Sequence, residues 1–125
     1  MVTVLIIEDN EQNMYMLAYL LENSGYKVVK AYDGVTGLKL AYNNQPDIIL
    51  IDIQLPDMDG YEICVKLRNT GLPTHTTIIA VSSYAMDADK EKAIEVGVDA
   101  YIEKPINPDT FVTQMNSIYN AKNQS

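Results

Sequence analysis

Reactive side chains stand at the ends of several short apolar runs in this sequence. The third run, IILI, leads directly into Asp52, and the first run, VTVLII, leads into Glu8 and Asp9. Ser82 follows the fourth run, and Lys104 comes just after the fifth. If these runs are neighbouring strands, three carboxylates, one hydroxyl and one amine meet at one place.

This set of groups is suited to phosphoryl transfer. Carboxylates held close together repel one another unless a cation lies between them. Mg²⁺, or Mn²⁺ in its place, is a hard cation that takes carboxylate, water and phosphate oxygens as ligands. Asp52 would act as a carboxylate nucleophile that accepts a phosphoryl group. Lys104 would add positive charge and Ser82 a hydrogen bond, which together supply most of what this reaction needs from a protein.

The elements that must position these groups alternate along the chain. Five apolar runs are separated by segments in which apolar residues recur at helical spacing. Asp33, Asp59 and Asn107 precede helical segments as candidate N-caps, and Gly25, Gly71 and Gly97 are candidate stop signals. The fourth helix, over residues 87–96, has a thin apolar face. The runs span Val2–Ile7, Lys27–Ala31, Asp47–Ile51, Thr77–Val81 and Ala100–Ile102.

Strands that alternate with helices predict an α/β fold, a doubly wound five-stranded parallel sheet with five helices on its two faces. Ligands of such sheets bind outside the carboxyl ends of the strands, where the reactive side chains stand. We expect one domain over residues 1–121, followed by a polar tail at 122–125.

Composition excludes several classes of function. The 125-residue chain has a net charge of −8, which disfavours direct binding to nucleic acid or to an anionic membrane surface. Its single cysteine, Cys64, cannot form an internal disulfide. No apolar run approaches the roughly 20 residues that span a bilayer. These features predict a cytoplasmic domain without a membrane segment.

The segments VLIIEDN, IDIQLPDMDGYE, AVSSYAM and AYIEKPI resemble those of response-regulator receiver domains, the CheY-like superfamily. The texture is most similar to stand-alone receivers of the DivK type and to receivers attached to hybrid kinases. The resemblance implies a flavodoxin-like sheet with strand order 2-1-3-4-5. It also implies that a histidine kinase or a histidine phosphotransfer protein is the partner that donates the phosphoryl group.

By this resemblance, Asp52 is the phosphoacceptor, and Glu8, Asp9 and the backbone carbonyl of Gln54 help it to bind Mg²⁺. Glu8 stands where many members of the family have Asp, and its longer side chain could hold the ion through water. Gln54 and Tyr84, two positions past the acceptor and the hydroxyl, are expected to tune the lifetime of the phosphoryl group.

The resemblance implies a conformational switch as well. Ser82, where many members have Thr, and Tyr101 are the switch pair, and Lys104 contacts the phosphoryl group before a cis Lys104–Pro105 bond. The surface built from the fourth helix, the fifth strand and the fifth helix is then the face that meets a downstream protein. We expect a monomer, or a weak dimer that depends on phosphorylation.

Some residues and motifs favour simpler or different interpretations. Asp57 and Asp59 are more simply read as cap or turn residues. The sequence has no G-x-x-x-x-G-K-[ST] loop, which argues against ATP binding. Haloacid-dehalogenase phosphatases have a second Asp two residues after the nucleophile, and here Gln54 occupies that place. A protein-interaction module that works without phosphorylation, or a receiver excised from a longer hybrid kinase or regulator, remains open. Because the chain stops after the fifth helical segment, we expect it to act by protein contact, as a relay or an allosteric ligand, and not as an enzyme with turnover.

Overall fold

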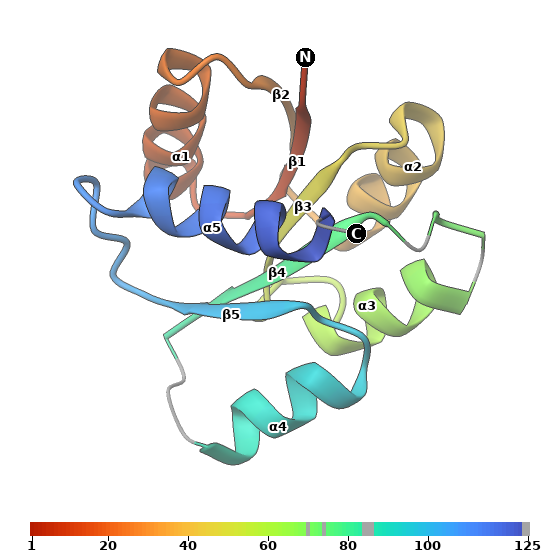
Figure 1. Cartoon of the computed structure of the whole chain (residues 1–125). Coiled ribbons are helices and arrows are strands. Elements are labelled where there is room, and N and C mark those ends of the chain that lie inside the picture. The colour runs from red at the N-terminus through yellow and green to blue at the C-terminus, as the bar shows by residue number, and fades with distance from the viewer. Residues whose placement is uncertain (70, 74, 84–86, 124–125) are drawn as a thin grey trace.

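Five parallel strands form one sheet in the computed structural model, which describes residues 1–69, 71–73, 75–83 and 87–123. The strands are β1 (Thr3–Ile7), β2 (Lys27–Ala31), β3 (Ile48–Asp52), β4 (Thr77–Ser82) and β5 (Ala100–Glu103). They lie in the order β2-β1-β3-β4-β5, and each neighbouring pair is parallel (Figure 1). The predicted fold class and strand order are confirmed.

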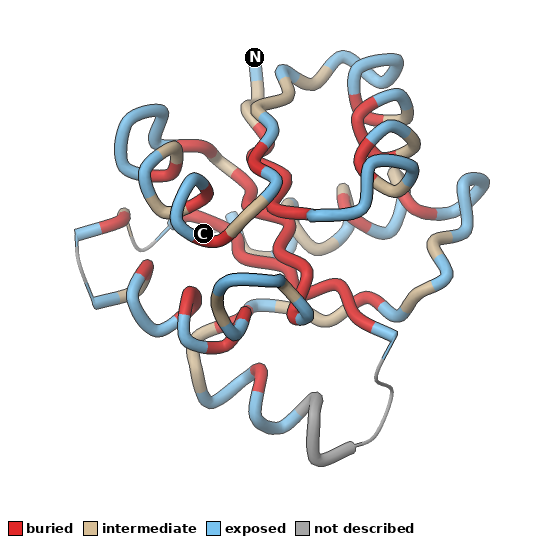
Figure 2. Tube along the Cα trace, turned by 180° about the vertical axis from the view of Figure 1, so that it is seen from behind, coloured by how far each residue is buried: buried red, intermediate tan, exposed pale blue. Residues whose placement is uncertain are grey.

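Helices cover both faces of the sheet. They are α1 (Glu11–Asn23), α2 (Gly34–Asn44), α3 (Gly60–Asn69), α4 (Asp87–Glu95) and α5 (Phe111–Asn123). Successive strand residues face opposite sides of a sheet. Accordingly, Val4 and Ile6 pack with residues of α1 and α5, whereas Leu5 and Ile7 pack with residues of α2, α3 and α4. The central strands are thereby buried on both sides, as the red segments in Figure 2 show.

Side chains cap the starts of three helices, and Asp33 and Asp59 are two of the predicted caps. The side chain of Asn10 accepts the N–H three residues on at 2.9 Å, and Asp33 does the same at 2.7 Å. Asp59 accepts the N–H two residues on at 2.9 Å, at the start of α3. All three carboxylate or amide oxygens satisfy N–H groups that the helices leave unpaired.

Glycine ends three of the helices, as predicted. Gly25, Gly71 and Gly97 have φ values of 91°, 96° and 98°, a backbone region that other residues rarely adopt. This conformation turns the chain away from the helix axis toward the next strand.

The last helix begins later and ends later than its sequence signals suggest. Asn107 accepts the N–H of Asp109 at 2.9 Å, but the segment 108–110 forms a turn, and α5 begins at Phe111. At the other end α5 reaches Asn123, two residues into the segment expected to be a tail. Near this end of the helix, Lys122 Nζ donates to the Thr76 carbonyl at 2.8 Å.

An ionic network lies at the end of the sheet where the parallel strands begin. The Asp99 carboxylate accepts hydrogen bonds from Arg68 Nη2 and Lys122 Nζ, both at 2.8 Å, and from the N–H of Ile78 at 2.8 Å. Arg68 also donates to the carbonyls of Gly97 and Thr76. The ends of α3 and α5 are therefore joined to the starts of β4 and β5. Among the described helices, none has the length and apolar character needed to cross a membrane.

Candidate functional site

The parallel strands bring the predicted acidic residues together at the carboxyl ends of the strands. Asp52 is the last residue of β3, and Glu8 follows β1, held by a hydrogen bond from its N–H to the Ala31 carbonyl at 3.0 Å. One carboxylate oxygen from each of Glu8, Asp9 and Asp52 lies within 4.8 Å of the other two. Glu8 and Asp52 are buried, with 2% and 5% of their surface exposed, whereas Asp9 is exposed. Asp9 is thus the exposed member of a cluster whose other two members are buried.

Lys104 neutralises part of this charge. Its Nζ lies 2.9 Å from Glu8 Oε1 and 3.1 Å from Asp52 Oδ2. The residue is positioned by a hydrogen bond from its backbone N–H to the Ser82 carbonyl at 2.8 Å, and the peptide bond to Pro105 is cis, as expected. One amine therefore contacts two of the three carboxylates in the cluster.

The electrostatics of the cluster are those of crowded carboxylates. Burial, which favours the neutral form, and the adjacent Asp52 carboxylate raise the pKa of Glu8 from 4.5 to about 7, although Lys104 acts in the opposite direction. Burial by itself would lower the pKa of Lys104, but the hydrogen bond to Glu8 and the charge of Asp52 outweigh it, so that this pKa is raised. The Lys104 amine therefore stays charged, and it forms ion pairs with both Glu8 and Asp52.

The cluster also has free capacity for a cation. Glu8 Oε2 is buried and has no hydrogen-bond partner among the described residues. A buried carboxylate oxygen without a partner is costly, and a divalent ion would satisfy it together with the exposed Asp9. The oxygen donors present therefore fit a hard divalent cation.

The loop after β3 continues the site. The backbone N–H of Gln54 donates to Asp52 Oδ1 at 2.9 Å, so the two oxygens of Asp52 have different partners. Gln54 is itself exposed and forms an isolated bridge with Asp59 across the loop. The predicted roles of Gln54, as a carbonyl ligand of the metal and in tuning the lifetime of the phosphoryl group, stay predictions.

The predicted switch residues lie on the two strands beyond Asp52. Ser82 is the last residue of β4 and is fully buried. Tyr101 is in β5, in register with Ala80, and packs against the core on the side of α3 and α4. Tyr84, expected to tune the lifetime of the phosphoryl group, lies outside the described residues.

Sequence reasoning missed a hollow beside Lys104. It has a volume of about 580 Å³ and is lined by Asn13, Met16, Ser83, Lys104, Pro105 and Ile106. Met16 could have indicated this hollow from the sequence. It is an apolar residue of α1 that lies outside the buried stripe of that helix. The hollow lies between α1 and the segment after β5, and Lys104 is one of its lining residues.

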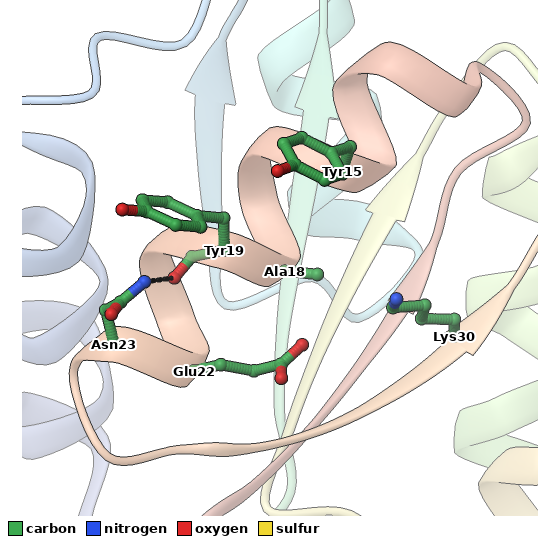
Figure 3. Close-up of a pocket in the computed structure, with 6 residues that line it drawn as sticks. All are labelled: Tyr15, Ala18, Tyr19, Glu22, Asn23 and Lys30. Carbon is green, nitrogen blue, oxygen red and sulfur yellow. Dashed lines mark hydrogen bonds between the residues drawn. The ribbon is translucent and has the colours of Figure 1, made fainter.

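A second hollow, of about 360 Å³, lies between α1 and the edge strand β2 (Figure 3). It contains none of the predicted site residues. Tyr15 and Tyr19 stack there with ring centroids 6.4 Å apart, and Glu22 and Lys30 contribute one charge of each sign. The remaining lining residues are Ala18 and Asn23.

Comparison with known proteins gives one consistent family. The sequence model of the response regulator receiver domain matches residues 4–116. The polar-differentiation response regulator DivK of Brucella anthropi is 40% identical over 115 residues, which cover 92% of this chain and 94% of that protein.

Solved structures agree in fold. The chemotaxis response regulator CheY4 of Vibrio cholerae has a TM-score of 0.90 at 27% identity, over 94% of this chain and 98% of that one. A two-component response regulator from Clostridium difficile has a TM-score of 0.91 at 27% identity, over 99% of this chain and 100% of that one. With its acidic cluster at the carboxyl edge of a sheet of this order, the chain belongs to the receiver domains of two-component response regulators.

Proposed function

We propose that Asp52 accepts a phosphoryl group from the phosphohistidine of a histidine kinase or a histidine phosphotransfer protein. In this step a carboxylate oxygen of Asp52 forms a bond to phosphorus while the bond between phosphorus and the donor's imidazole nitrogen breaks. The observation that carries the proposal is the meeting of Glu8, Asp9 and Asp52 within 4.8 Å, with Lys104 bound to two of them. Membership of the receiver family supports the same reaction.

Glu8, Asp9, Asp52 and the backbone carbonyl of Gln54 would hold Mg²⁺, or Mn²⁺ in its place. When bound, the ion supplies positive charge that offsets the carboxylates and the transferred group. Glu8 Oε2, for which the described part of the chain provides no partner, and the exposed Asp9 support this assignment, since both offer oxygen atoms to a ligand.

Lys104 binds the phosphoryl oxygens in this proposal. Its Nζ is held 3.1 Å from Asp52 Oδ2, so a group added to that carboxylate comes within reach of the amine. The raised pKa of Lys104 keeps it protonated at neutral pH. The charge that now pairs with two acids would then pair with the phosphoryl group.

The phosphoryl donor would dock over the hollow beside Lys104. Met16, Pro105 and Ile106 contribute apolar side chains to the lining of this hollow, together with Lys104. A partner helix seated there could present a phosphohistidine to Asp52 while its own apolar side chains are covered. In this proposal the donor protein binds the surface formed by α1 and the segment after β5.

Phosphorylation would be read out through Ser82 and Tyr101. Ser82 donates a hydrogen bond to the phosphoryl group, which draws it toward Asp52 and leaves space for Tyr101 to turn inward. The faces of α4, β5 and α5 change as a result, and a downstream protein binds one of the two states preferentially. A hollow of about 360 Å³ between β5 and α5, lined in part by Tyr101 and Phe111, supports this face as the docking surface. The chain would act as a phosphoacceptor switch whose own chemistry is limited to Mg²⁺-dependent self-phosphorylation and autodephosphorylation, not as an enzyme with turnover.

Intact-mass measurement tests the reaction. Wild type treated with acetyl phosphate and Mg²⁺ should gain about 80 Da in a form that hydroxylamine removes, as an acyl phosphate does. The variant Asp52→Asn should gain nothing, and Asp47→Asn is the matched control, because Asp47 binds the N–H of Thr3 at the other edge of the sheet. A stable mass gain on Asp52→Asn would place the acceptor at another residue. No gain on wild type would favour a module that works without phosphorylation.

A further inference from the structure

The Asp57 carboxylate reaches from the loop after β3 to the start of a different helix. Its Oδ1 accepts the backbone N–H of Gly34 at 2.8 Å, and its Oδ2 accepts that of Val35 at 3.1 Å. These donors begin α2 and lie 23 and 22 residues away in the sequence. The hydrogen bond from Gly34 is the main cause of a lowered pKa for Asp57, which is therefore ionised at neutral pH.

Helix α2 has a cap of its own. Asp33 accepts the N–H of Thr36 at 2.7 Å from the position just before the helix. A local N-cap of this kind satisfies one of the N–H groups that the start of a helix leaves unpaired. What Asp57 adds is a connection between α2 and the loop in which it lies.

That loop carries the proposed metal and phosphoryl site. It begins at Asp52, whose Oδ1 accepts the N–H of Gln54 at 2.9 Å, and Gln54 bridges to Asp59 on the other side of the loop. Met58 packs on α2 beside the same helix start, since a Cβ added to Gly34 would lie only 3.1 Å from Met58 atoms. The loop is therefore closed on itself and pressed against α2 at Asp57 and Met58.

We propose that Asp57 is a positioning residue for the site, which fixes the backbone of the loop at Gln54 relative to Asp52 through its hydrogen bonds to the start of α2. This inference rests on the proposed function, because the Gln54 carbonyl is one of the proposed metal ligands. The proposed role goes beyond capping α2. Asp57 lies in the loop after β3, and its hydrogen bonds to α2 are proposed to act mainly by holding that loop in place.

A pair of variants separates positioning from capping. Asp57→Ala removes the connection, and Asp33→Ala removes the other cap of the same helix without touching the loop. Both should lower the stability of the protein to urea. Only Asp57→Ala should weaken Mg²⁺ binding in calorimetry, by about tenfold, the lower end of what loss of an outer hydrogen-bond partner costs a metal site. Asp57→Asn keeps an oxygen acceptor and should recover part of the affinity.

A second measurement works without metal. The Gln54 N–H should exchange with solvent faster in Asp57→Ala than in wild type, and at the wild-type rate in Asp33→Ala, because its hydrogen bond to Asp52 depends on the loop. Equal exchange in wild type and Asp57→Ala, or equal effects of the two Ala variants on exchange or on Mg²⁺ affinity, would overturn the inference. Wild type that binds no Mg²⁺ would refute the proposed metal site instead, and the exchange rates would still decide the role of Asp57.

Discussion

Glu8 should make the metal-free protein less stable as pH rises. Its pKa is about 7 in the folded protein against an ordinary value of 4.5, so the folded state binds a proton that the unfolded state releases between these two pH values. Stability then falls as pH rises, because the unfolded state binds fewer protons across this window. The full difference corresponds to about 3 kcal/mol at about 1.4 kcal/mol for each tenfold change in proton affinity, taken as an upper limit.

The substitution Glu8→Gln tests this directly, because glutamine has the shape of the protonated acid and does not titrate. Urea unfolding near pH 5 and near pH 8, in EDTA, should show wild type losing about 2 kcal/mol more than Glu8→Gln over that interval. Near pH 8 the variant should be the more stable protein. Glu11→Gln is the matched control, since it removes the same charge from an exposed position at the start of α1.

Parallel pH profiles for wild type and Glu8→Gln would refute the reasoning. They would mean that Lys104 alone keeps Glu8 ionised in the folded state, and that burial does not dominate. With Mg²⁺ in place of EDTA, wild type should regain stability near pH 8 to a greater extent than Glu8→Gln, because a ligand that binds only the folded state stabilises it.

Three further substitutions test other parts of the structure. Asp99→Ala should lower the free energy of unfolding by about 2 kcal/mol, since it removes charged hydrogen bonds at the edge of the sheet away from the site, and the mass gain from acetyl phosphate should persist. Gly60→Ala should cost about 2 kcal/mol or more and slow phosphorylation, because the added Cβ would lie 2.9 Å from the backbone oxygen of Asp52; normal urea stability would contradict this. Lys92→Met should cost about 0.5–1 kcal/mol, as the Lys92 Nζ lies 4.6 Å from the centroid of the Tyr61 ring, and a double-mutant cycle with Tyr61→Leu should show that the two effects are coupled.

Much of the site could be predicted because parallel topology does the positioning. Once the apolar runs before Asp52 and Glu8 are taken as strands of one parallel sheet, their ends must meet at one edge, and no further information is needed. The strand order itself came from the resemblance to receiver domains, because alternation of strands and helices is compatible with more than one order. Lys104 was found in the same way, from its place after the last strand.

Contacts between side chains distant in sequence could not be predicted. Asp57 looks like an ordinary turn residue, and nothing local indicates that its oxygens bind the start of α2, 22 and 23 residues away. Lys122 stands in a polar segment that resembles a fraying tail, and only the tertiary structure shows its hydrogen bonds to Thr76 and Asp99. The raised pKa of Glu8 likewise depends on how deeply the folded chain buries it, which the residue type does not reveal.

The hydrogen bonds of Lys122 have a mechanical consequence for α5. The helix is held at its far end by Thr76 and Asp99, whereas its first turn, at Phe111, lies on the side of the phosphoryl site. Phe111 and Met115 are buried in the core as well, so α5 is anchored at its start by packing and at its end by hydrogen bonds. A partner that binds the exposed face of α5 would therefore meet a helix held at both ends, and moving that helix would require the core beneath it to repack.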